Sequence, residues 1–82
     1  MLTAEIYVTY KKNVVDPQGL TVKHALESLG FRNLKEVRMG KLIKVKLGAK
    51  NRSSARRDIK NMCRKLLANP VVEDYSFEIT EQ

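Results

Sequence analysis

Residues 1–20 read MLTAEIYVTYKKNVVDPQGL, a strand pattern followed by the start of a helix. The strand pattern is strict alternation, which is typical of a half-buried strand, with one face formed by Leu2, Ala4, Ile6, Val8 and Tyr10. Lys11-Lys12-Asn13 interrupts the alternation. Asp16 can then accept hydrogen bonds from the free amides of a first helical turn, and Pro17 suits the first helical position. This stretch therefore predicts a strand, a short connection and a helix.

The residues after this stretch continue the helix and then return to strand patterns. An apolar stripe is formed by Leu20, Val22, Ala25, Leu26 and Leu29, and Gly30 can close the helix in the left-handed conformation. Gly19 in the first turn weakens the helix slightly and allows a close backbone approach. Two strands are expected next, Leu34–Met39 and Lys41–Leu47, joined by a tight turn at Met39-Gly40. In the second of them, Ile43, Val45 and Leu47 are expected to face inward.

A second helix and a last strand complete the chain. Asn51 or Ser53 can cap the helix, whose apolar positions are Ala55, Ile59, Met62, Cys63, Leu66 and Leu67. Asn69-Pro70 is expected to end it, because proline moves the preceding residue away from helical geometry. Val71–Thr80 is the last strand, with Tyr75, Phe77 and Ile79 facing inward. The order predicts an α+β, ferredoxin-like βαββαβ domain spanning residues 1–82, with a four-stranded antiparallel sheet and both helices on one face. The first and third strands are expected to be central.

Length and charge restrict the functional classes. Eighty-two residues form one small domain, which gains stability from self-association. There is no apolar run long enough to cross a bilayer, Met1–Glu5 lacks a basic start, and Cys63 is the single cysteine, so a cytoplasmic protein is expected. Thirteen Lys or Arg lie from Arg32 to Lys65 against two acids. This basic region could meet nucleic acid, phosphorylated metabolites or an acidic protein surface, or its charges could simply be solvated.

The candidate reactive groups do not combine into a catalytic site. His24 is the single histidine and has no second ligand at metal-binding spacing, so no metal site is expected. Cys63 lies on the apolar stripe of the second helix, where a buried, unreactive thiol is expected. Glu73 and Asp74 are neighbours in a strand and point to opposite faces, so they do not form an acid–base pair. No catalytic residue is predicted.

Three blocks of sequence resemble the PurS family, the small subunit of phosphoribosylformylglycinamidine (FGAM) synthase of purine biosynthesis. The first is Asp16-Pro17-Gln18-Gly19 with Ala25-Leu26 and Leu29-Gly30, the second is Val37-Arg38-Met39-Gly40-Lys41, and the third runs from Met62 to Tyr75. The resemblance covers essentially the entire chain. It departs at Lys50–Lys65, where more acids are expected.

The resemblance implies a subunit without an active site of its own, in a complex that acts as an ATP-dependent glutamine amidotransferase ligase. It implies a bridge between the glutaminase subunit and the large synthetase subunit that supports ammonia transfer. No cofactor is expected in this chain, since ATP and Mg are used by the large subunit. A homodimer or a dimer of dimers is expected, with no membrane contact. The candidate partner contacts are Asp16, Pro17, Gly19, Arg38, Gly40, Lys41, Asn69 and Pro70.

Two alternatives remain at this point. A basic ferredoxin-like domain could bind RNA, but the third predicted strand has no aromatic residue for base stacking and Tyr7 alone faces outward from the first, so nucleic acid is disfavoured. A regulatory domain of the same fold could instead bind a small molecule at a helix start such as Asp16–Gly19.

Overall fold

The computed structural model describes residues 1–81 and contains a three-stranded antiparallel sheet, two α-helices and one π-helical turn. The elements follow in the order β1 (Leu2–Tyr10), α1 (Pro17–Ser28), β2 (Gly40–Leu47), α2 (Arg52–Met62), η1 (Cys63–Leu67) and β3 (Glu73–Glu81). The strand order is β2-β1-β3, so β1 is central and the two other strands form the edges. None of the helices within residues 1–81 has the length and apolar character to cross a bilayer.

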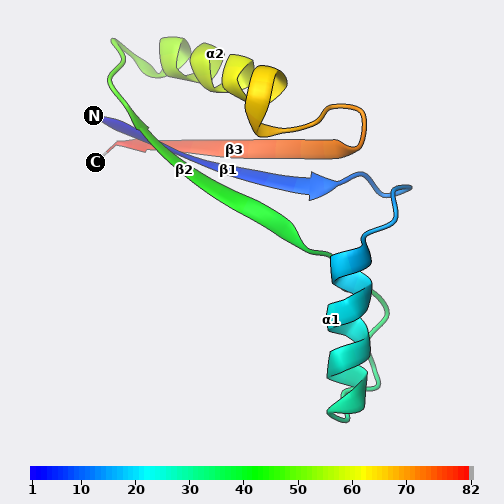
Figure 1. Cartoon of the computed structure of the whole chain (residues 1–82). Coiled ribbons are helices and arrows are strands. Elements are labelled where there is room, and N and C mark those ends of the chain that lie inside the picture. Colours follow the sequence, from blue (N-terminus) through cyan, green and yellow to red (C-terminus); the bar gives the residue numbers. More distant parts are fainter. Residues whose placement is uncertain (82) are drawn as a thin grey trace.

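The register brings the start of β1 beside the ends of β2 and β3. Leu2 pairs with Leu47 on one side and with Glu81 on the other, and Ile6 pairs with Ile43 and Phe77. The start of β1 and the end of β3 lie beside each other at one end of the sheet (Figure 1). At the opposite end, β1 finishes where β2 and β3 begin.

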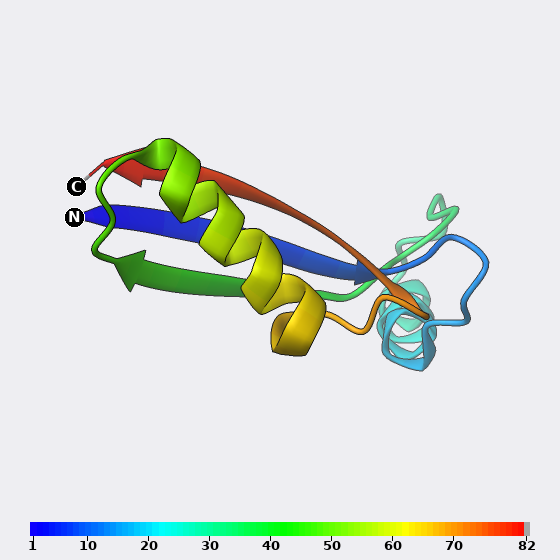
Figure 2. The same ribbon diagram turned by 90° about the horizontal axis from the view of Figure 1, so that it is seen from above.

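The core lies between α2 and one face of the sheet. Helix α2 runs obliquely across the three strands (Figure 2). It buries Ala55 and Ile59, and the following Cys63 is buried as well, since positions four apart face the same side of a helix. These side chains pack on Ala4, Ile6 and Val8 of β1, and inward residues of the edge strands complete the cluster: Ile43, Val45, Leu47, Tyr75, Phe77 and Ile79. The alternation predicted for the first, third and last strands is therefore confirmed.

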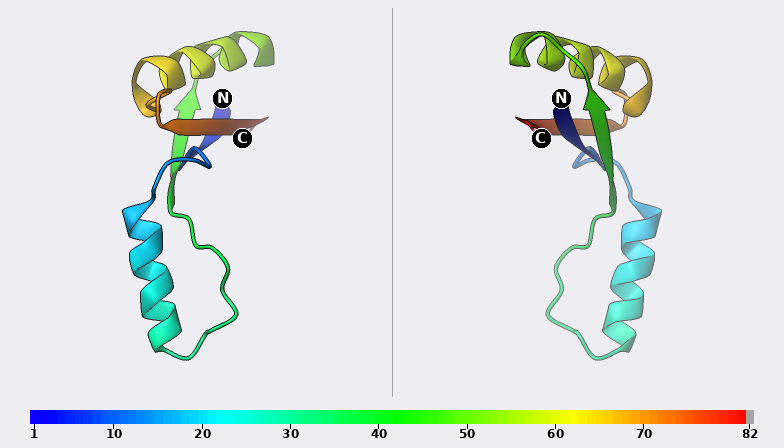
Figure 3. Two further views of the ribbon diagram at one scale, coloured as in Figure 1. Left: turned by 90° about the vertical axis from the view of Figure 1, so that its right-hand side faces the viewer. Right: turned by 90° about the vertical axis from the view of Figure 1, so that its left-hand side faces the viewer.

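Helix α1 does not cover the sheet. It projects away from the end of the sheet, and residues 31–39 return beside it without strand pairing (Figures 1 and 3). We call residues 17–39 the arm. The prediction that both helices lie on one sheet face was wrong, because the connections at both ends of α1 direct the helix outward rather than back over β1.

The predicted strand Leu34–Met39 is also absent from the described chain. This segment follows α1, and β2 begins only at Gly40, so no tight hairpin forms at Met39-Gly40. The sheet accordingly has three strands, and the strand that contains Lys41–Leu47 is an edge strand rather than a central one. A strand needs a partner for its backbone amides and carbonyls, and the arm places no neighbouring strand beside residues 34–39 within the described part of the chain.

Candidate functional site

The eight candidate contact residues converge at one end of the sheet. Gly40 starts β2 opposite Thr9, and Glu73 starts β3 opposite Tyr10, so the segments that precede these two strands meet where β1 ends. Asp16, Pro17 and Gly19 begin α1 at the same place. We call this region the junction, because it connects the sheet to the arm.

Asp16 fastens the start of α1 to the chain that enters β2. Its Oδ1 accepts a hydrogen bond of 3.0 Å from the Gly19 amide, and its Oδ2 accepts one of 2.7 Å from the Met39 amide. The side chain is buried. The Gly19 and Met39 amides, together with the nearby Arg38 guanidinium, lower the pKa of this carboxyl below its usual value. The predicted helix cap is confirmed, and the carboxylate also holds the end of the arm that leads into β2, at Met39.

Arg38 fixes the turn between β1 and α1. Its guanidinium donates to the carbonyl oxygens of Tyr10, Lys11 and Val14 at 3.2, 2.8 and 3.2 Å. Five donors in a planar fork allow one arginine to satisfy several carbonyls that have no strand or helix partner. The partly buried Arg38 side chain therefore stabilises the junction. Its guanidinium donates to backbone carbonyls of this chain.

Two glycines allow the segments of the junction to approach closely. A Cβ at Gly19 would overlap the carbonyl oxygen of Val37 and would lie 2.8 Å from Asp16 Oδ2. A Cβ at Gly40 would lie 2.7 Å from the Val8 carbonyl oxygen. Glycine at both positions thus has a packing reason, as the sequence suggested for Gly19.

A second network holds the turn before β3. The Glu73 carboxylate accepts a 2.7 Å hydrogen bond from the Asn69 amide and lies 3.7 Å from Lys41 Nζ. The Asn69 side chain accepts from the Val71 amide at 3.1 Å, so Pro70 sits in a tight turn. Helix α2 passes through η1 before this turn, and the last helical residue is Leu67. The contacts around Glu73 are therefore separate from the hydrogen bonds of Asp16. They involve Lys41 and Asn69, with Pro70 in the turn.

The arm presents apolar side chains to solvent. Leu20, Leu29 and Phe31 are 48%, 74% and 55% exposed. Gly30 closes α1 with φ 105°, as predicted, and the chain then turns back toward the sheet. A second exposed apolar group, Met62 and Leu66, borders a shallow depression beside β2 that Val45 and Leu67 also line. The sequence indicated the apolar stripe of α1 but not that it would lie off the sheet.

The reactive groups considered in the sequence lie apart from the junction. Cys63 is buried under α2, and burial raises the pKa of its thiol, which disfavours the nucleophilic thiolate. His24 is exposed on the arm. No group of three or more His, Cys, Asp or Glu within residues 1–81 is arranged to hold a metal ion.

Known proteins resemble this chain over its whole length. The model of the family PurS, described as phosphoribosylformylglycinamidine (FGAM) synthase, matches residues 3–81. The phosphoribosylformylglycinamidine synthase subunit PurS of Bacillus subtilis is 41% identical over 83 residues, which cover 99% of this chain and 95% of that protein. The subunit of the same name from Methanocaldococcus jannaschii is 39% identical over 79 residues, covering 96% and 95%.

Solved structures agree with the sequence comparison. A B. subtilis PurS crystal structure superposes with a TM-score of 0.89 at 41% identity, covering 99% of this chain and all of that one. A chain in the structure of PurLQS from Thermotoga maritima superposes with a TM-score of 0.85 at 34% identity, covering 98% of this chain and 99% of that one.

Proposed function

The chain belongs to the PurS family, the subunit of FGAM synthase in purine biosynthesis, and from this premise we propose how it serves that enzyme. The proposed role is a bridge without chemistry of its own, which joins the glutaminase subunit to the ATP-dependent synthetase subunit and supports ammonia transfer between them. The observation that carries this proposal is the match over residues 3–81, together with the likeness to a chain of the PurLQS structure. Cofactor chemistry, with ATP and Mg, is assigned to the large subunit.

The buried position of Cys63 supports a non-catalytic role. Its thiol is the one side chain of this protein that could act as a covalent nucleophile by thiolate attack, and burial disfavours the thiolate. The free thiol also fits a reducing compartment, and we place the protein in the cytoplasm.

The test is reconstitution. The two other subunits are mixed with or without this protein, and synthesis of FGAM is followed first with glutamine and then with ammonium as the nitrogen source. A bridge is required for the glutamine-dependent reaction and much less for the ammonium-dependent one. Equal stimulation of both reactions would contradict a role in ammonia transfer, and no stimulation of either would contradict the bridge.

Self-association is the second part of the proposal. A compact domain of 82 residues has a radius of gyration of about 12 Å, whereas this chain measures 16.1 Å, with extents of 50 × 28 × 15 Å. The difference comes from the arm, whose apolar side chains gain about 1.5–3 kcal/mol each on full burial. A second copy can cover the arm, and residues 34–39, which carry a strand pattern, can then pair with a strand of that copy. The four-stranded sheet expected from the sequence is in this proposal a property of the dimer.

Oligomeric state tests this part directly. We expect sedimentation equilibrium at micromolar concentration to give a dimer or a dimer of dimers. The double change Leu29→Glu and Phe31→Glu should shift the protein to monomer, because it places two charges in the apolar surface of the arm. Ser28→Glu, at the exposed polar residue that ends α1, is the control and should leave the dimer intact. A wild-type monomer would refute the proposal.

A further inference from the structure

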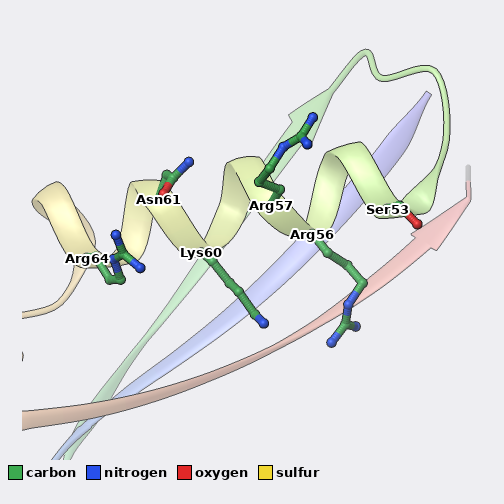
Figure 4. A pocket seen from close by; sticks show the side chains of 6 residues that line it. All are labelled: Ser53, Arg56, Arg57, Lys60, Asn61 and Arg64. Atoms are coloured by element: carbon green, nitrogen blue, oxygen red, sulfur yellow. The ribbon is translucent and has the colours of Figure 1, made fainter.

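The outer face of α2 and of the following turn η1 carries a row of positive side chains that the proposed bridge does not yet use. Arg56, Arg57, Lys60 and Arg64, which we call the basic stripe, are all exposed and line a shallow depression with Ser53 and Asn61 (Figure 4). Arg56 and Lys60 point toward the side of β3, while Arg57 and Asn61 point away from the sheet. The inward face of the same helix holds Ala55 and Ile59, so the stripe lies on the outside of the molecule.

Within residues 1–81, the cations of the basic stripe form no ion pair with an acidic side chain. The ion pairs of residues 1–81 involve Lys11, Lys41 and Lys44, and none of the stripe cations has a carboxylate oxygen within 4.0 Å. Arg56 instead lies over the Phe77 ring, 5.4 Å from its centre. From Lys50 to Lys65 there are seven basic residues and one acid, Asp58, a local charge of 7 − 1 = +6.

This arrangement weakens the isolated helix. Arg56 and Lys60, and again Lys60 and Arg64, are like charges four residues apart, and each such pair destabilises a helix by about 0.2–0.5 kcal/mol. The first turn of α2 has no acidic residue, and Arg52 lies there, at the positive end of the helix dipole. These positive charges lower the stability of their own helix. Binding of an external anion would neutralise them and would account for their presence.

The shape of the stripe indicates what kind of anion fits. From Ser53 to Arg64 the helix rises about 16 Å, which exceeds the span of one phosphate group. The depression is open, and its cations are exposed, so a small anion would remain solvated. Arg56, Lys60 and Arg64 repeat at about 6 Å along the axis, which is the repeat of carboxylates placed every four residues on a partner helix. Proteins that bind single-stranded nucleic acid combine a basic groove with aromatic side chains on which bases stack, and the Phe77 ring lies under Arg56.

We propose that the basic stripe docks onto an acidic helix or surface of another subunit of the same synthase. This inference rests on the proposed function, since it specifies which face of the bridge meets one of the partners. The stripe and the arm lie at different ends of the molecule (Figures 1 and 2). Docking through α2 therefore leaves the arm free for a second copy of this chain.

The experiment compares two variants of equal charge in the full complex. Arg57→Glu, Lys60→Glu and Arg64→Glu together lower the net charge from +7 to +1, and so do Lys12→Glu, Lys44→Glu and Lys46→Glu, which are exposed and lie outside both the stripe and the arm. Binding of each to the two other subunits is measured by calorimetry at several salt concentrations, with circular dichroism to compare folding. A third variant carries Gln at residues 57, 60 and 64. It removes the three positive charges without adding acids, in case the charge reversal unfolds the helix.

We expect the wild-type affinity to fall as salt rises, because salt screens exposed charges. The α2 reversal should weaken binding about tenfold or more and flatten the salt dependence, while the matched control should change binding less than about threefold. Unchanged binding of both α2 variants, or equal loss in the control, would overturn the inference while leaving the bridge intact. Stripe-dependent binding to a polyuridylate oligonucleotide with normal complex assembly would overturn it too. Failure of the wild type to bind the other subunits would overturn both proposals.

Discussion

The substitution Gly19→Ala tests whether the junction, rather than the intrinsic preference of α1, determines the conformation of the arm. In an isolated helix this change is favourable by up to about 1 kcal/mol. Here the new methyl group would overlap the carbonyl oxygen of Val37 and would stand 2.8 Å from Asp16 Oδ2. Both neighbours are fixed, since one is backbone and the other is hydrogen-bonded to the Gly19 and Met39 amides.

Relief of this overlap requires residues 37–39 to move away from the start of α1. Overpacking of a close contact costs about 1–3 kcal/mol, which exceeds the helical gain at this first-turn position. We therefore expect the free energy of unfolding to fall by about 1–2 kcal/mol and the melting temperature to fall by roughly 4–8 °C for each kcal/mol.

The assay is urea denaturation at one fixed protein concentration, because association shifts apparent stability. Gly48→Ala is the matched control: a Cβ at Gly48 meets nothing within 4 Å, so this variant should be as stable as the wild type or slightly more stable. If Gly19→Ala stabilised the protein as much as an ordinary helical Gly→Ala change, the close approach at the junction would not exist, and our account of the arm would be refuted.

Three further changes probe the core, the turn and the carboxylate. Ile59→Ala removes a fully buried side chain between α2 and β1 and should lower the free energy of unfolding by about 2–5 kcal/mol, measured by urea titration; a loss below about 1 kcal/mol would contradict this packing. Arg38→Gln should speed amide exchange in residues 11–16 because three carbonyls lose the guanidinium, of which the Lys11 carbonyl keeps another donor, the Val14 amide, whereas Arg32→Gln at an exposed position should not. The folded pKa of Asp16 is below its usual value, so its contribution is present above about pH 4 and is lost as the pH falls through the folded pKa. As the pH is lowered from 6 to 2, the melting temperature should therefore fall more steeply in the wild type than in Asp16→Asn. Parallel curves would contradict a stabilising role of the ionised carboxylate.

The elements that sequence predicted well are those whose cause is local. Asp16 and Pro17 start α1, Gly30 closes it with positive φ, and Asn51 caps α2 by accepting from the Ser54 amide. Each outcome depends on residues within one turn of the signal. The period of two in β1 likewise predicted which side chains face the core, because successive side chains of a strand point to opposite faces of the sheet.

The features that sequence missed depend on what lies beside an element rather than within it. Residues 34–39 have a strand pattern, but a pattern specifies only which face is apolar and cannot supply a pairing partner. The apolar stripe of α1 predicted burial without identifying the surface that buries it. The hydrogen bonds of Arg38 to three carbonyls also had no sequence signal beyond the presence of an arginine before Gly40.

In the dimer that we propose, the junction supplies local contacts and the arm supplies contacts between copies. Asp16 and Arg38 bind backbone groups, so they fix the direction of the arm without burying its apolar side chains. Leu29 and Phe31 remain more than half exposed at the far end, where no hydrogen bond of the junction can reach them. An arm held rigid at its base loses less conformational entropy when a partner covers its tip, so the contacts that keep the arm off its own sheet would favour its burial in the proposed dimer. A variant that loosens the junction, such as Gly19→Ala, should consequently weaken association as well as stability.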